Sequence, residues 1–258
     1  MERILSILMQ LSVSDEQAML IVLVILLLLM LVFTLWVRGG ARPSFRPIPG
    51  FAALRGLIGQ VAETGQALHV SLGIEGVGGK GTAETLAGLT VLEYLARHMA
   101  VCDAPPIVTV ADPSLLPIAQ DALRHAYLQY CNVDYYDPSQ VRFIAPQAVA
   151  YATGVMGVLG REKLRANVMV GSFGDEYLLM GETGVRRGVS QIVGTANPQT
   201  LPFVFTSADQ TLIGEEMYAA GAYLASLPAH VGSLIAQDWV RVFIVLFIII
   251  GVIGKTFL

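Results

Sequence analysis

The chain has 258 residues, of which 54% are hydrophobic and 14% charged, and its mean hydropathy is +0.62. Soluble domains carry about 25% charged residues, so this shortage of charge argues against a wholly soluble protein and indicates membrane segments. The formal net charge of −4 argues against a nucleic-acid-binding protein, which usually presents a basic face.

Residues 1–37 consist of two segments. Residues 1–17 carry apolar residues at helical spacing with polar residues between them, which is typical of an amphipathic helix. This segment could lie flat on the outer leaflet, pack on a partner's membrane helix, or extend the next helix outward. Residues 18–37 form an uncharged apolar run of the length, roughly 20 residues, that spans a bilayer. No cleavage-site pattern follows the run, which predicts a retained anchor.

A basic flank follows this first span, and the positive-inside rule places that side in the cytoplasm. Residues 38–50 contain prolines, glycines and arginines and are predicted to form an extended linker. Residues 239–258 are predicted to form a second span, with a buried helix of a soluble domain as the alternative. Both termini would then lie outside the cytoplasm. The residues expected at the membrane interface are Trp36, Arg38, Arg42, Arg46, Trp239 and Arg241.

Between the spans, residues 51–235 alternate short apolar strands with amphipathic helices. The expected strands cover residues 68–74, 107–111, 141–145, 166–173, 190–195 and 201–206. The expected helices cover residues 51–64, 82–101, about 113–130, 146–160, 176–183 and about 208–227. This alternation predicts βαβ units. The expected fold class is α/β, a Rossmann-like, mostly parallel, three-layer sheet domain inserted between two transmembrane helices.

A glycine-rich stretch, GIEGVGGKGTAET, lies between the first expected strand and its helix, at residues 73–85. The Walker A pattern fails because Gly81, rather than Ser or Thr, follows Lys80. The spacing of Gly76, Gly78 and Gly81 does satisfy G-x-G-x-x-G, the glycine pattern of dinucleotide-binding βαβ units. The pattern alone is weak evidence, although its position between a strand and a helix is the correct one.

Some charges around this loop favour the binding of an anion and others oppose it. A helix that begins near Thr82 would direct free N–H groups and the positive end of its dipole at the loop, and Lys80 adds positive charge. Glu75 and Glu84 flank the loop and would repel a phosphate. The acidic residue of the dinucleotide fingerprint is expected about 20 residues later, whereas Asp112 follows Gly81 by about 30. The alternative is a flexible turn in which Thr82 caps the helix.

Parallel strands bring their carboxyl ends to one edge of a sheet, where α/β proteins bind ligands. The ligand-binding candidates expected there are Gly76, Gly78, Gly79, Lys80, Gly81, Thr82, Asp112, Ser172 and Ser207. Helix caps occupy such loops whatever the function, so a structural role is the alternative. No Ser-His-Asp order, G-x-S-x-G elbow or metal-ligand spacing is recognised, so no catalytic residue, metal or cofactor is assigned. Cys102 and Cys131 are expected to be reduced structural thiols.

Three stretches are similar to an uncharacterised family of bacterial membrane proteins found in filamentous green non-sulfur bacteria and their anaerobic relatives. The stretches are GTAETLAGLTVLEYLARHMAVCDAPPIVTVADPSLLPIAQDALRHAY, LIGEEMYAAGAYL and HVGSLIAQDWVRV, and the likeness extends from about residue 81 to the C-terminus. The resemblance implies a bacterial membrane setting. Together with the basic flank, it gives an expected location in the bacterial inner membrane, with the main domain in the cytoplasm. It supplies no catalytic residue.

The sequence therefore favours a non-enzymatic function in assembly, as a homo-oligomer or as a subunit of a larger membrane complex. Its expected partners are the lipid bilayer, other copies of the chain or other membrane subunits, and not nucleic acid. The alternative is a module that binds a nucleotide or another anionic small ligand through the loop at residues 76–82. A hydrolase that uses Ser172 is a third and more distant interpretation.

Overall fold

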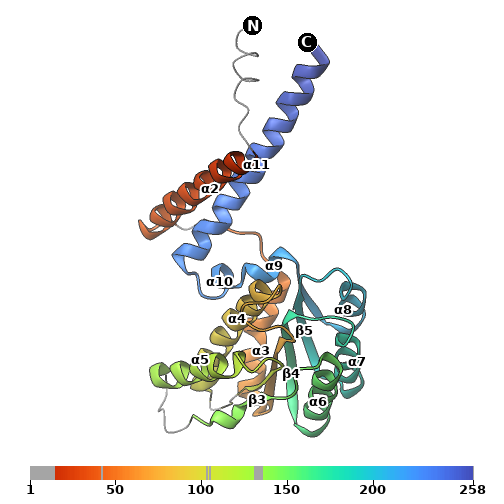
Figure 1. Cartoon of the computed structure of the whole chain (residues 1–258). Helices are drawn as coiled ribbons and strands as arrows, with labels where there is room; N and C mark the ends of the chain where they lie inside the picture. Colours follow the sequence, from red (N-terminus) through yellow and green to blue (C-terminus); the bar gives the residue numbers. More distant parts are fainter. Residues whose placement is uncertain (1–14, 42, 103, 105, 131–135, 258) are drawn as a thin grey trace. The chain divides into compact units, whose positions relative to one another are not determined.

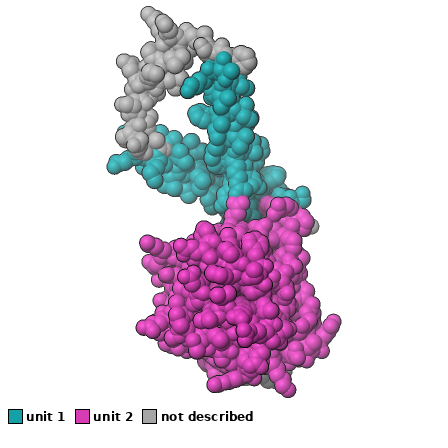
Figure 2. Space-filling view, turned by 90° about the vertical axis from the view of Figure 1, so that its right-hand side faces the viewer, with its two compact units in different colours: residues 1–44, 226–258 teal, residues 45–225 magenta. Residues whose placement is uncertain are grey.

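The structure is a computed structural model that describes residues 15–41, 43–102, 104, 106–130 and 136–257. It contains two compact units, Met1–Ser44 with Ser226–Leu258 and Phe45–Ala225, which Figure 2 colours separately. Most of the predicted amphipathic segment at residues 1–17 lies outside the described residues, as do Arg42 and Cys131.

The first unit consists of the helices α2 (Asp15–Arg38) and α11 (Pro228–Phe257). Both are long and apolar enough to cross a membrane, with a mean hydropathy of 3.3 for Met19–Arg38 and 2.1 for Pro228–Thr256. Among the described residues, 0% of the most apolar window of either helix is buried. The structure thus contains two candidate membrane spans, by length and composition.

The two helices pack against each other through one small residue and one pair of rings. A Cβ atom at Gly232 of α11 would lie 2.7 Å from the backbone nitrogen of Thr34, so only glycine allows this approach. The rings of Phe33 and Trp239 stack with their centroids 6.5 Å apart. Close approach of helix backbones at small residues is typical of membrane helix pairs.

The second unit is built on a six-stranded sheet in the order β3-β2-β1-β4-β5-β6, and every pair of neighbouring strands is parallel (Figure 1). The strands are β1 (Ala67–Gly73), β2 (Ile107–Val110), β3 (Val141–Phe143), β4 (Leu164–Ser172), β5 (Ser190–Thr195) and β6 (Gln210–Ile213). The helices are α3 (Pro49–Thr64), α4 (Thr82–Val101), α5 (Leu115–Tyr130), the 3-10 turn η2 (Pro138–Gln140), α6 (Ala148–Arg161), α7 (Tyr177–Arg187), α8 (Leu201–Ser207), α9 (Glu215–Tyr218) and α10 (Ala220–Tyr223).

Helices cover both faces of this sheet, with α3, α4 and α5 on one face and α6, α7 and α8 on the other (Figure 1). Because both faces are covered, the central strands are buried along nearly their whole length, as β1 and β4 show. The prediction of an α/β domain with a mostly parallel sheet is confirmed. In the described residues, every pair of neighbouring strands is parallel.

The predictions for the last strand and helix of this unit are wrong. Residues 201–206, expected as a strand, belong to the helix α8, in which Pro202 occupies the first turn, a position that proline favours. The next residues, expected as a helix through residue 227, instead form β6, which pairs with β5 from Ile192↔Gln210 onward. Gly214, with φ of 57° and ψ of −119°, then separates β6 from α9 in a backbone conformation that favours glycine.

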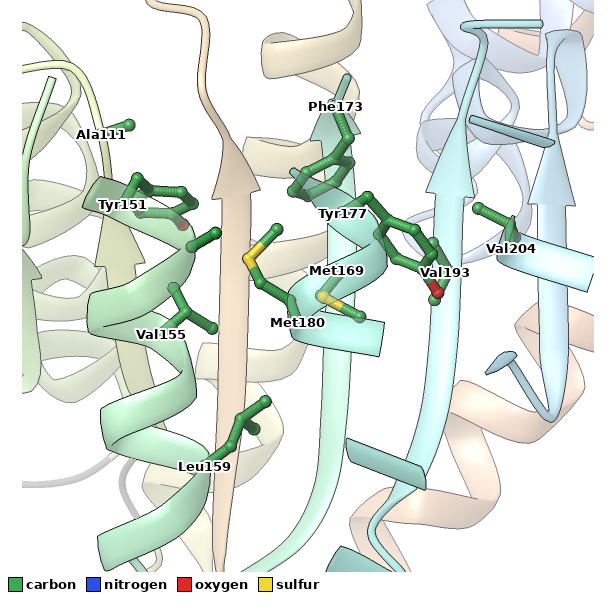
Figure 3. Packing of buried hydrophobic residues seen from close by; sticks show 11 residues of the cluster. Ala111, Tyr151, Val155, Leu159, Met169, Phe173, Tyr177, Met180, Val193 and Val204 are labelled. Atoms are coloured by element: carbon green, nitrogen blue, oxygen red, sulfur yellow. The ribbon is translucent and has the colours of Figure 1, made fainter. Parts of the chain in front are cut away.

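The core between the sheet and the helices α6 and α7 combines aliphatic, sulfur-containing and aromatic side chains. Figure 3 shows Tyr151 and Val155 of α6, Met180 of α7 and Met169 of β4 directed into one buried cluster. Tyr151 and Tyr177 are the largest fully buried side chains. Large rings that are buried in this way need partners for their hydroxyl groups.

The same face of the sheet carries a buried polar row that crosses four strands. His69 of β1 bonds through Nδ1 to Asn167 Oδ1 of β4 at 2.6 Å and through Nε2 to Thr109 Oγ1 of β2 at 3.0 Å. Asn167 donates from Nδ2 to Gln191 Oε1 of β5 at 3.1 Å. The Tyr151 hydroxyl closes the row with a bond of 2.9 Å to Thr109 Oγ1. All of these side chains are buried.

The direction of these bonds follows from the backbone at one end of the row. Gln191 Nε2 contacts the carbonyl oxygens of Gly181 and Ser207 at 2.9 and 2.8 Å, so its amide nitrogen must be the donor. Gln191 Oε1 then accepts from Asn167, and Asn167 Oδ1 accepts from His69 Nδ1. The imidazole therefore carries a proton on Nδ1. Burial favours the neutral form of the ring, in which Nε2 accepts from the Thr109 hydroxyl.

This arrangement depresses the basicity of the imidazole. Burial lowers the pKa of His69 to about 4, the hydrogen bond to Asn167 acts in the opposite direction, and the positive charge of Arg142 lowers the pKa further. A fully paired neutral histidine orders the sheet register, because a slip of any strand would leave buried donors and acceptors without partners.

The two ends of the α/β unit are joined at Tyr223 of α10. Its ring packs against those of Phe45 and Phe51, with centroid separations of 5.7 and 5.2 Å. Its hydroxyl donates to the carbonyl oxygen of Arg46 at 2.7 Å, and Arg55 donates to its backbone carbonyl. The Arg46 guanidinium pairs with Glu216 at 3.0 Å, so the structure gives it a protein partner within this unit.

Candidate functional site

The strand order creates a switch point at the centre of the sheet. From β1 the chain moves outward to β2 and β3, and it then returns to β4 on the other side of β1. The connections after β1 and β4 therefore lead away in opposite directions. Open α/β sheets bind their ligands at the carboxyl ends of such strands, and the order found in this protein is that of dinucleotide-binding domains.

Two glycines allow the carboxyl ends of β1 and β4 to approach closely. Gly73 has a φ of +88°, and a Cβ atom there would lie 2.5 Å from the carbonyl oxygen of Ser172. A Cβ atom at Gly171 would overlap the carbonyl oxygen of Leu72. The pairing of the two strands also shifts register between Ser71 and Gly73. The switch point is thus shaped by the backbone, at positions that only glycine can occupy.

The glycine loop that follows β1 is held in shape by Thr82, the first residue of α4. The Thr82 hydroxyl accepts a hydrogen bond from the Gly78 N–H at 2.9 Å and donates to the Gly79 carbonyl oxygen at 2.7 Å. Thr82 is not the N-cap that the turn interpretation expected, because Gly81 occupies that position without a side-chain cap. Gly78 has a φ of +106°, which requires glycine.

Two of the predicted ligand-binding positions outside the loop lie against it. A Cβ atom at Gly76 would stand 2.6 Å from Asp112 Oδ2, which places this carboxylate directly over the first glycine of the pattern. A Cβ atom at Gly81 would stand 2.8 Å from the Ser172 Cβ atom. The structure therefore brings Asp112 from the end of β2 and Ser172 from the end of β4 to the same loop.

Two glutamates give this loop an acidic environment. The Glu75 carboxylate lies beside the loop, since a Cβ atom at Gly79 would be 2.8 Å from its Oε2 atom. Burial raises the pKa of the Glu84 carboxyl, the Ser172 hydroxyl acts in the opposite direction, and Glu75 raises it further. Glu84 Oε2 is a buried oxygen without a hydrogen-bond partner among the described residues.

The backbone at the start of α4 supplies the opposite polarity. In the described part of the chain, neither the Lys80 N–H nor the Gly81 N–H donates a backbone or side-chain hydrogen bond. Lys80 itself is exposed, and Thr82 is half-buried. Unpaired N–H groups at a helix N-terminus, together with the helix dipole, attract a negatively charged group.

The remaining candidate, Ser207, does not belong to this site. It ends α8 and precedes β6, so it lies towards the amino end of the sheet and not at its carboxyl edge. Its hydroxyl contacts the Tyr177 hydroxyl at 2.6 Å and donates to the Phe203 carbonyl oxygen at 2.8 Å. Burial raises the pKa of Tyr177 to about 12. Ser207 was expected at the carboxyl edge because residues 201–206 were wrongly predicted to form a strand.

Hydrolysis by a serine and the binding of a metal ion each need a particular group of side chains. Among the described residues, no hydrogen bond joins Ser172 to a histidine, and no group of three or more His, Cys, Asp or Glu side chains could hold a metal ion. A serine without a neighbouring base is a poor nucleophile. The site is suited to binding through backbone N–H groups and carboxylate acceptors.

Comparison with known proteins identifies the family. A family model matches residues 9–258, which is nearly the whole chain. The chain belongs to the family described as Domain of unknown function (DUF6754). No curated protein and no solved structure matches it.

This DUF6754 chain departs from the dinucleotide fingerprint in one respect that sequence reasoning missed. In the fingerprint, the third glycine lets the first helix pack closely on the sheet. In the DUF6754 structure this function falls to Gly88, where a Cβ atom would overlap the carbonyl oxygen of Val170. Gly81 ends the loop as the N-cap of α4 and lies against Ser172 at the end of β4. The sequence alone does not indicate this function of Gly88, because its contact is made with a distant strand.

Proposed function

We propose that the α/β unit is a nucleotide-binding module, with its site at the carboxyl ends of β1 and β4. The observation that carries the proposal is the strand order, which puts the glycine loop of residues 76–82 at the switch point with Asp112 and Ser172 beside it. The N–H groups of Lys80 and Gly81 would bind the phosphate oxygens, with the Lys80 ammonium group close by.

Glu75 opposes this binding in the structure as it stands. Its carboxylate lies beside Gly79 and its Cβ and Cγ atoms lie beside Gly81, in the region that the phosphate would enter. Like charges at this separation repel, so the Glu75 side chain must turn away when an anionic ligand binds. We therefore expect Glu75→Gln to tighten nucleotide binding, whereas Lys80→Ala weakens it.

We also propose that the module is tethered to a membrane by α2 and α11. The support is the length and apolar composition of both helices. The basic residues at and after the end of α2, of which Arg38 is the first, favour a cytoplasmic position for the α/β unit, with both termini outside. A bacterial inner membrane, as in green non-sulfur bacteria, is the setting that the sequence resemblance implies.

A thermal-shift screen of the full chain in detergent tests the nucleotide proposal. We expect a nucleotide such as NAD, FAD or ADP to raise the melting temperature, and Lys80→Ala to reduce that rise. Lys163→Ala is the matched control, because Lys163 is an exposed loop lysine that precedes β4 at the opposite edge of the sheet. The proposal is wrong if no nucleotide stabilises the chain, or if both variants respond like the wild type.

A second candidate function is assembly, as a homo-oligomer or as a subunit of a larger membrane complex. The supporting observation is the exposed apolar surface of α2 and α11, on which Leu31 and Phe247 are 58% and 79% exposed. Lipid or other membrane helices would cover such a surface. Mass photometry of the chain in mild detergent tests this function. A defined oligomer is expected, and a clean monomer would contradict it.

A further inference from the structure

The end of β2 carries one carboxylate whose position bears on the chemistry of the ligand. Asp112 follows the buried residues Val110 and Ala111, and its Oδ1 atom accepts the Ser114 N–H at 2.7 Å. This bond fixes the side chain in a turn at the start of α5. Both carboxylate oxygens lie against Gly76 at the beginning of the glycine loop, since a Cβ atom there would be 2.6 Å from Oδ2 and 2.7 Å from Oδ1.

The orientation leaves Oδ2 available to a ligand that occupies the loop. No hydrogen bond or ion pair among the described residues engages this atom, and the side chain is only half-buried. An ionised carboxylate can only accept hydrogen bonds. It would therefore bind a hydroxyl or amine of the ligand and repel a phosphate at the same point.

No basic residue follows Asp112 closely in the chain. The residues that follow Asp112 are Pro113, Ser114 and Leu115, and the first basic residue of α5 is Arg124, more than two turns into the helix. Sites that accept a ribose phosphate at the end of this strand place an arginine nearby.

We infer that the site selects a nucleotide whose adenosine ribose carries free hydroxyl groups, as in NAD, and rejects the 2′-phosphorylated form, as in NADP. This inference rests on the proposed nucleotide-binding function. Asp112 is the residue that determines the specificity, and its Oδ2 atom accepts the ribose hydroxyl. Gly76 is required beside it, because any side chain at that position would displace the carboxylate.

The test compares NAD with NADP, which differ by this one phosphate, by isothermal titration of the full chain in detergent. We expect NAD to bind at least about tenfold more tightly than NADP. Asp112→Asn removes the charge and is expected to reduce that ratio, and Gly76→Ala is expected to do the same. Asp121→Asn, which removes an exposed carboxylate from α5, is the control and should leave the ratio unchanged.

The outcomes separate the inference from the proposed function. Equal binding of NAD and NADP, or tighter binding of NADP, would overturn the specificity while leaving a nucleotide site in place. The specificity is also overturned if Asp112→Asn and Gly76→Ala both retain the wild-type ratio. If neither nucleotide binds and other nucleotides also fail to bind, the proposed function and the inference fall together.

Discussion

Lowering the pH is expected to destabilise the α/β unit through His69, the neutral imidazole at the centre of the buried polar row. Unfolded histidine titrates near 6.5, whereas burial lowers the pKa of His69 to about 4 in the folded chain. Between these two values the unfolded chain binds more protons than the folded chain. The free energy of unfolding therefore falls as the pH drops through this window, and the contribution of His69 is fully present above 6.5.

The size of the effect follows from the same two values. At about 1.4 kcal/mol for each pKa unit, the interval from 6.5 to about 4 corresponds to roughly 3 kcal/mol of unfolding free energy. That amount is a large fraction of the stability of an ordinary domain, about 5–15 kcal/mol. Protonation would also leave Nε2 as a second donor facing the Thr109 hydroxyl, whose hydrogen would have to turn away.

Denaturant unfolding of the full chain in detergent, followed by circular dichroism at several pH values, measures this dependence. His69→Gln should lower stability at neutral pH but remove most of the loss between pH 6.5 and 4. His125→Gln is the control, because it removes an imidazole that is 65% exposed on α5, and its acid profile should match the wild type. If His69→Gln loses as much stability on acidification as the wild type, the reasoning is refuted.

Two further changes test close packing. Gly88→Ala forces a Cβ atom onto the Val170 carbonyl oxygen and should lower stability by about 1–3 kcal/mol, whereas Gly157→Ala has open space and should raise it by up to about 1 kcal/mol; equal melting temperatures would contradict the packing. Tyr223→Ala removes the ring that packs against Phe45 and Phe51. It should lower stability by about 1–3 kcal/mol and speed proteolysis of the linker before α3. An unchanged cleavage rate would show that this junction does not hold the linker.

Local patterns were sufficient for most elements of the α/β unit. The helix α4 begins and ends where its apolar stripe and the glycine loop predicted, at Thr82 and Val101. The strand β5 likewise has the predicted bounds, Ser190–Thr195. The strand order was beyond such reasoning, because it depends on pairing between distant segments. The exchange of helix and strand at α8 and β6 has the same cause, since LPFVFT is rich in β-favouring residues and only the pairing of QTLI with β5 decides between them.

The candidate site was predictable in its residue types but not in its geometry. The sequence indicates the glycines, Asp112 and Ser172, and the parallel sheet predicts that they share an edge. It does not show that the Thr82 hydroxyl bonds to Gly78 and Gly79 of the loop rather than capping the helix. Nor does it show that Glu75 lies over the glycines, because side-chain direction in a loop depends on the folded backbone. Ser207 was assigned to the carboxyl edge because residues 201–206 were expected to form a strand. They form the helix α8, so Ser207 lies at the opposite edge of the sheet.

Hydrogen-exchange mass spectrometry of the full chain shows whether a nucleotide binds at the carboxyl ends of β1 and β4. With saturating NAD, we expect slower exchange in residues 74–84 and 112–116, at the glycine loop and the start of α5. We expect no change in residues 186–190, where α7 leads into β5 at the opposite edge. Unchanged exchange in the glycine loop, or protection only at the opposite edge, would mean that no nucleotide binds at the proposed site.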